Sequence, residues 1–80
     1  AEPAVTAECA APLLRPGGLL VVSDPPDDRD RWPAAGLAML GLAGSRTVRD
    51  GVALFVGRLV GDVADRYPRR TGVPGKRPLF

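Results

Sequence analysis

An apolar run with no polar interruption, residues 19–22 (LLVV), constrains the fold of this chain more than any other feature. Such a run is typical of a strand that is covered on both faces, as in a mostly parallel α/β sheet. Pro16, Gly17 and Gly18 stand directly before it, and proline and glycine are the residues that commonly end a helix. We therefore expect a helix, a glycine turn and a buried strand, which together make half of an α/β unit.

The residues before this turn predict a helix over residues 3–14. Val5, Cys9 and Leu13 recur at i, i+4 and i+8, which places them in one apolar stripe on a helix. Pro12 lacks an amide hydrogen, so the helix should kink or end near it. Because the sequence has no histidine to act as its base, we interpret Cys9 as a buried structural thiol.

A second helix is expected from about Arg31 to Leu42, after a polar, proline-containing loop over residues 23–31. Asp30 is a suitable N-cap for it, and a proline in the first turn is tolerated. Glycines 41 and 44 would end this helix. The apolar residues that would face the sheet are Trp32, Leu37 and Leu40.

Two further runs, residues 45–50 and 52–60, are typical of strands. Asp50-Gly51 joins them, and this dipeptide favours the tight turn of a β-hairpin because both residues accept positive φ at low cost. The expected order is therefore α-β-α-β-β. A hairpin that follows an α/β alternation indicates the antiparallel end of a sheet whose earlier strands are missing from these residues.

Composition excludes several stabilising devices and site types. One cysteine allows no internal disulfide, and without histidine or a second cysteine the usual zinc ligand sets are missing. Apolar runs stay far below the roughly 20 residues that cross a bilayer, and the chain does not open on a signal-peptide pattern. We therefore expect a small cytoplasmic α/β unit without a membrane partner, and with a core built mainly from Ala, Leu and Val.

Charge is distributed unevenly along the chain. Residues 1–65 carry a net charge of −3, whereas residues 66–80 carry +5 with three prolines and no acid, so that the whole chain has +2. Such asymmetry favours an anionic partner, although a basic C-terminal run can also be only a solvated end. Aromatic and apolar residues between the cations suggest anchoring. We expect one unit over residues 1–63 and a basic tail over 64–80 that its prolines hold extended. RNA contacts are expected from Arg66, Tyr67, Arg69, Arg70, Lys76 and Arg77.

Acidic residues in the loop after the first strand offer two chemical hypotheses. Asp24-Pro25-Pro26 resembles the motif with which amino-methyltransferases hold a target nitrogen, but no aromatic residue follows, so a proline-stiffened loop is the preferred interpretation. Four acids could donate oxygen ligands to a metal, yet arginines sit among them and the spacing of a calcium loop is missing. These acids are Asp24, Asp27, Asp28 and Asp30. We assign no catalytic, cofactor-binding or metal residue.

Two phrases of the sequence resemble a known family. Residues 13–22 (LLRPGGLLVV) are similar to the segment before the fifth strand of class I S-adenosylmethionine-dependent methyltransferases, in which a helix, a strand and a terminal antiparallel hairpin follow. Residues 67–79 (YPRRTGVPGKRPL) are similar to the ending of many RsmG (GidB) proteins, which methylate ring nitrogen seven of a guanine in small-subunit ribosomal RNA.

The resemblance implies that these residues are the C-terminal portion of such an enzyme, with a Rossmann-like sheet. The glycine-rich loop and the ribose-binding acid of that fold have no counterpart here, so S-adenosylmethionine would be held by the N-terminal remainder of the parent protein. The implied partners are ribosomal RNA or the small ribosomal subunit, and the isolated piece should be inactive. A noncatalytic RNA-binding module and a degenerate homologue kept for interaction remain as alternatives.

Overall fold

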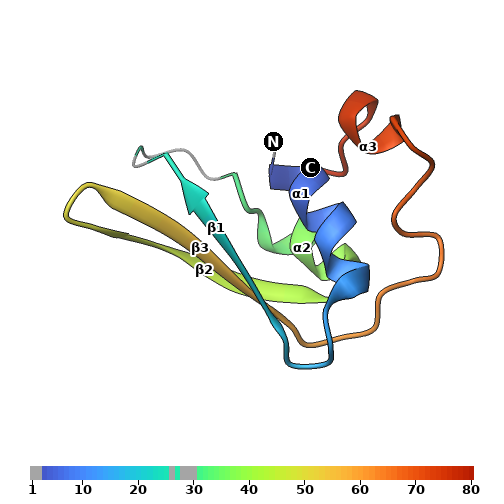
Figure 1. Cartoon of the computed structure of the whole chain (residues 1–80), viewed down its shortest axis with the longest axis horizontal. Helices are drawn as coiled ribbons and strands as arrows, with labels where there is room; N and C mark the ends of the chain where they lie inside the picture. The colour runs from blue at the N-terminus through green and yellow to red at the C-terminus, as the bar shows by residue number, and fades with distance from the viewer. Residues whose placement is uncertain (1–2, 26, 28–30) are drawn as a thin grey trace.

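The computed structural model describes residues 3–25, 27 and 31–80. Within these residues, three strands form one antiparallel sheet in the order β1-β3-β2, with helices on one side of it (Figure 1). The strands are β1 (Leu19–Asp24), β2 (Leu42–Arg49) and β3 (Val52–Leu59), and the α-helices are α1 (Pro3–Ala10), α2 (Ala34–Met39) and α3 (Val73–Lys76). The predicted α/β class is confirmed, and α3 is an addition within the tail.

The predicted hairpin between β2 and β3 is confirmed. Its turn places Asp50 at φ 53° and Gly51 at φ 75°, and the register pairs Arg49 with Val52 across it. Both turn residues are therefore in the left-handed region that this type of tight turn requires. β2 begins earlier than expected, because Gly41 at φ 74° ends α2 and the chain becomes extended at the next residue.

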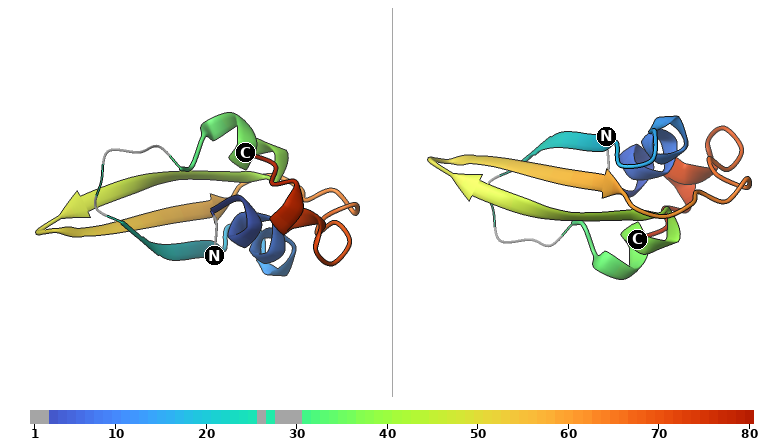
Figure 2. Two further views of the ribbon diagram at one scale, coloured as in Figure 1. Left: turned by 90° about the horizontal axis from the view of Figure 1, so that it is seen from above. Right: turned by 90° about the horizontal axis from the view of Figure 1, so that it is seen from below.

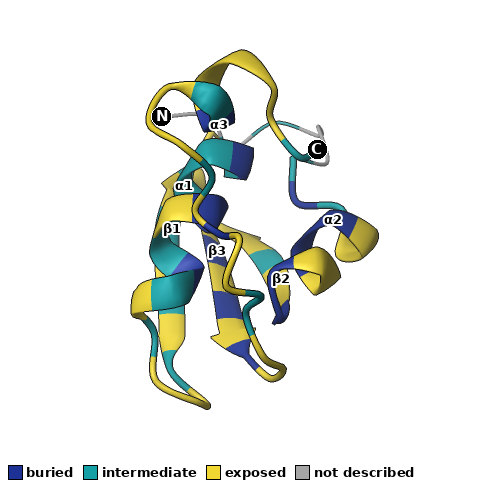
Figure 3. Cartoon of the chain, turned by 90° about the vertical axis from the view of Figure 1, so that its right-hand side faces the viewer, coloured by how far each residue is buried: buried dark blue, intermediate teal, exposed yellow. Residues whose placement is uncertain are grey.

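Helices α1 and α2 pack on the same face of the sheet, as the views from above and below show (Figure 2). β3 alternates between the two faces, with residues 53, 55, 57 and 59 buried and residues 52, 54, 56 and 58 exposed (Figure 3). Phe55 is fully buried at the centre and stacks on Trp32, with 3.9 Å between ring centroids and 3° between ring planes. The prediction that Trp32, Leu37 and Leu40 face the sheet is confirmed.

The apolar stripe predicted for the first helix is wrong. Cys9 and Leu13 are exposed, and the buried side of α1 and the turn after it consists of Ala4, Ala7, Glu8 and Ala11. Alanines spaced three or four residues apart share one face of the helix, and Ala7 and Ala11 belong to the same buried cluster as Trp32 and Phe55. The expected effect of Pro12 is confirmed, since α1 ends at Ala10 and a single 3-10 turn follows.

Two further expectations need correction. β1 is not covered on both faces, because Leu19 and Val21 are exposed while Leu20 and Val22 pack against the core. α2 is shorter than predicted: its N-cap is Pro33 in an extended conformation, and the helix starts at Ala34. The ring of Pro33 disfavours the helical conformation of Trp32 before it, so the helix does not reach back to Arg31. Asp30, the predicted cap, lies outside the described residues. In the parts of the chain that the structure describes, no helix has the length and hydrophobicity of a membrane span.

Candidate nucleic-acid interface and the surfaces around it

The basic tail, residues 64–80, folds back against α1 instead of lying extended (Figure 1). Tyr67 and Pro74 are buried, and the single turn of α3 packs against α1. The expectation of a wholly extended, proline-held segment is therefore wrong, because Gly72 at φ 88° reverses the chain and allows this turn. The predicted anchoring role of the apolar tail residues agrees with the burial of Tyr67 and with Phe80, whose ring lies directly against Gly36 of α2.

A buried ion pair fastens the tail to α1. The carboxylate of Glu8 has no exposed surface, and the Arg69 guanidinium donates to it from Nη2 at 2.7 Å and from Nε at 2.9 and 3.1 Å. The backbone amide of Arg69 donates to the same carboxylate at 2.7 Å. Forked pairing of this kind is the strongest geometry available to arginine and a carboxylate. It joins residues that lie 61 positions apart in the sequence.

The same pair sets the protonation state of both groups. Hydrogen bonds from the Arg69 side chain hold the pKa of Glu8 below its ordinary value, although burial acts in the opposite direction. The Glu8 carboxylate likewise raises the pKa of Arg69 above its ordinary value. Both groups are therefore charged at neutral pH, and each neutralises the other inside the fold.

The residues predicted to contact RNA divide into two groups in the structure. Arg66, Arg70, Lys76 and Arg77 are exposed, and the Arg66 guanidinium lies 4.9 Å from the centre of the Tyr67 ring. Tyr67 is buried and Arg69 is three-quarters buried in its ion pair, so these two are occupied by the fold itself. Sequence reasoning missed Glu8, whose position among small residues in α1 was the available signal.

Ion pairs also occupy the acids at the end of β1. The side chain of Asp24 is almost fully buried and accepts from Arg46 Nε at 2.6 Å, and Arg31 lies 3.7 Å from the same oxygen. Arg31 pairs with Asp27 at 2.6 Å as well. Residues 26, 28 and 30 of the proposed motif and metal set lie outside the described residues. Among the residues that are described, no three of His, Cys, Asp or Glu come together as a metal site.

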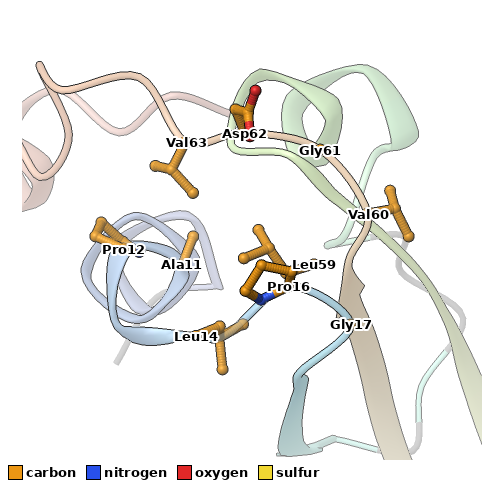
Figure 4. Close-up of a pocket in the computed structure, with 10 residues that line it drawn as sticks. All are labelled: Ala11, Pro12, Leu14, Pro16, Gly17, Leu59, Val60, Gly61, Asp62 and Val63. Carbon is orange, nitrogen blue, oxygen red and sulfur yellow. The ribbon is translucent and has the colours of Figure 1, made fainter.

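A cavity of about 470 Å³ lies between the 3-10 turn after α1, the loop before β1 and the segment that follows β3 (Figure 4). Leu59, Pro16 and Val63 turn toward this space, whereas the side chain of Asp62 turns away from it. The described residues that line it include no cation. The cavity is therefore unsuited to a phosphate, and the candidate interface remains the cationic surface of the tail.

The sheet face opposite the helices carries an apolar strip, here called the open face. Its members are Leu19, Val21, Val52, Leu54 and Val56, and all five are exposed. They lie on β1 and β3, where Val21 is directly opposite Val56. The same face of β2 carries mostly polar residues, including Ser45, Thr47 and Arg49. Within the described part of the chain, β1 pairs only with β3, so its outer edge also has no partner.

Comparison with known proteins finds two related sequences. The chain is 40% identical over 85 residues to ribosomal RNA small subunit methyltransferase G of Deinococcus deserti, a match that covers 95% of this chain. It is 30% identical over 88 residues to the protein of the same name from Dictyoglomus thermophilum, with all of this chain covered. The chain spans roughly a third of the length of these relatives, 35% and 36%.

These matches confirm the resemblance that the two sequence phrases indicated, and they are consistent with a C-terminal portion of such a protein. No family model matches the chain. No solved structure matches it either.

Proposed function

Because the chain is related along its whole length to part of ribosomal RNA small subunit methyltransferase G, we propose that it is the C-terminal portion of an S-adenosylmethionine-dependent rRNA methyltransferase. In this proposal it closes one end of a Rossmann-like sheet and supplies a basic, RNA-facing tail. The reaction would be methylation of ring nitrogen seven of a guanine. The observation that carries the proposal is the match over 95% of this chain to 35% of a methyltransferase.

The open face supports the idea that this chain is completed by another part of the same protein. Exposed apolar strips of this kind mark surfaces that another body covers, and this one is continuous with the outer edge of β1. We assign both to the remainder of the enzyme, because about two thirds of each relative lies outside the matched region. The polar open-face residues of β2 fit the other end of the sheet, which would face solvent.

The exposed cations of the tail support the assignment of an RNA partner. Arg66, Arg70, Lys76 and Arg77 are available to phosphates, while the tail itself is fixed to the core through Arg69 and Tyr67. Neutralising phosphates releases counterions, so the affinity for RNA should fall steeply as salt rises.

The described residues do not fit a site for S-adenosylmethionine. The acid at the end of β1, Asp24, is already bound to Arg46, and the one charged residue among those that line the 470 Å³ cavity, Asp62, turns its side chain away from it. The methyl donor would therefore bind in the remainder of the enzyme.

A chimera tests the proposal. The matched segment of the Deinococcus deserti methyltransferase is replaced by this chain, and methyl transfer to unmethylated small-subunit rRNA is measured beside the isolated 80-residue chain. We expect methyl transfer by the chimera and none by the isolated chain. Methyl transfer by the isolated chain would refute the proposal that the catalytic machinery lies elsewhere.

The alternative of a noncatalytic binding module predicts a different pair of results. The isolated chain would bind RNA, while the chimera would be folded but inactive. Calorimetric titration of the chimera with S-adenosylmethionine serves as the control, because a heat of binding shows that the donor pocket is intact. An inactive chimera with an intact donor pocket would count against the proposal that this chain completes a methyltransferase.

A further inference from the structure

We propose that Glu8 and Arg69 are positioning residues, whose ion pair holds the exposed cations of the tail in the arrangement that binds the phosphate backbone of RNA. This inference rests on the proposed RNA-facing role of the tail. It gives a role to Glu8, the most buried charged residue in the described part of the chain. It also separates the tail cations that contact RNA from Arg69, which holds them in position.

The ion pair closes the tail into a loop. Nη2 of Arg69 donates both to Glu8 and, at 2.6 Å, to the backbone carbonyl of Arg77. One guanidinium therefore binds α1 and the far end of the loop at the same time. Between these two points lie Arg70 and Lys76, both exposed.

Backbone hydrogen bonds stiffen the loop that Arg69 closes. The amide of Val73 donates to Arg70 at 3.0 Å, that of Lys76 to Gly72 at 3.1 Å, and that of Arg77 to Val73 at 2.8 Å. A loop held at both ends and along its length loses little conformational freedom when it docks. Preorganisation of this kind increases affinity by reducing the entropy cost of binding.

A purely structural role explains the ion pair less well. A buried charge pair contributes little stability compared with apolar residues of similar volume, since both groups must be desolvated. Glu8 lies on the alanine-rich side of α1, where an apolar residue would satisfy packing. The pair instead fixes the orientation of the tail, because the planar Arg69 guanidinium binds Glu8 of α1 and the carbonyl of Arg77 at the same time.

Charge and geometry give opposite predictions for one substitution, which makes the inference testable. Glu8→Gln removes a negative charge, so the net charge of the chain rises from +2 to +3. If only charge mattered, RNA affinity would stay equal or increase. If the ion pair positions the cations, RNA affinity falls. We expect a loss of about tenfold, because Arg70, Lys76 and Arg77 are no longer held in place.

The experiment measures fluorescence anisotropy of a labelled small-subunit rRNA transcript with the 80-residue chain over a salt series. Glu8→Gln is compared with Arg70→Ala, which removes an exposed cation but leaves the ion pair intact. Arg70→Ala should weaken binding and lower the salt slope by about one. Tryptophan fluorescence of Trp32 reports that each variant is folded.

Equal or tighter binding by folded Glu8→Gln, with weaker binding by Arg70→Ala, would overturn this inference and leave the proposed function standing. If removing Arg70, Lys76 and Arg77 together left affinity unchanged, the RNA-facing tail itself would be refuted, and this inference with it. Should Glu8→Gln not fold, Arg69→Lys replaces it. That variant keeps the charge but loses the fork, so unchanged affinity would again overturn the inference.

Discussion

Arg69→Ala is expected to be among the most destabilising single substitutions in this chain. It removes three side-chain contacts to Glu8, at 2.7, 2.9 and 3.1 Å, and the bond to the Arg77 carbonyl. Removing one partner of a buried ion pair costs about 3 to 5 kcal/mol, because the other charge is left uncompensated. The Arg69 side chain is one quarter exposed, which argues for the lower end, about 3 kcal/mol.

That loss is large for a chain of this size. A domain of 80 residues has a free energy of unfolding of roughly 4 to 12 kcal/mol. With a urea m-value of about 1 kcal/mol/M, the unfolding midpoint should fall by about 3 M. Trp32 provides the fluorescence signal because it stacks on Phe55 in the core. Arg70→Ala is the matched control, since it removes the same charge from an exposed neighbour and should change stability by less than about 0.5 kcal/mol.

The pH dependence of stability provides a second test of the same reasoning. The folded-state pKa of Glu8 is lowered, so its ion pair contributes fully above the ordinary glutamate pKa of about 4.3. This contribution is lost as pH falls through the folded-state pKa. In Arg69→Ala the guanidinium is lost and only the backbone amide still donates to Glu8, so burial would instead raise the pKa of Glu8, and this acid-side loss should disappear. A midpoint shift equal to that of Arg70→Ala, with an unchanged pH profile, would refute the argument.

Three further substitutions follow from the core, the hairpin and the open face. Phe55→Ala should cost about 3 to 5 kcal/mol in urea unfolding, because Phe55 is fully buried against Trp32, and a cost below 1 kcal/mol would contradict its central place. Gly51→Ala should cost about 1 kcal/mol through its positive φ alone, since a Cβ there meets no neighbouring atom within 4 Å. Val21→Lys should leave the isolated chain within about 0.5 kcal/mol but lower the melting temperature of the chimera, and equal effects in both would argue against the assigned cover of the open face.

Features that depend on neighbouring residues in the sequence were predictable. The hairpin follows from Asp50-Gly51, whose backbone preference decides the turn before any tertiary contact forms. The end of α1 near Pro12 follows in the same way from a missing amide hydrogen. Trp32 and the leucines of the α2 region were assigned to the core correctly, because large apolar side chains gain most from burial.

Features that depend on distant partners were not predictable. The stripe through Cys9 and Leu13 followed from hydrophobicity, but α1 instead turns its alanines and Glu8 inward, since Arg69 compensates the buried charge from 61 positions away. Spacing within one helix carries no information about such a partner. The run at residues 19–22 predicted cover on both faces, and the described residues of this chain supply it on only one.

Under the proposed assembly, the position of the tail is tied to the edge of the sheet that meets the rest of the enzyme. α1 precedes β1, with the 3-10 turn and a short loop between them, and the tail is fixed to α1 through Glu8. β1 and β2 are the two edge strands of the described sheet, and only β1 carries large apolar residues on the open face, so the sheet would extend beyond β1 alone. The RNA-facing cations would thus be placed relative to the catalytic part through one short path, from Arg69 to Glu8 and along α1 to β1. Without this ion pair, the tail would be joined to the sheet only through β3, the strand that it follows in the sequence. The position of the cations would then depend on β3, which lies next to β2 at the end of the sheet that would face solvent.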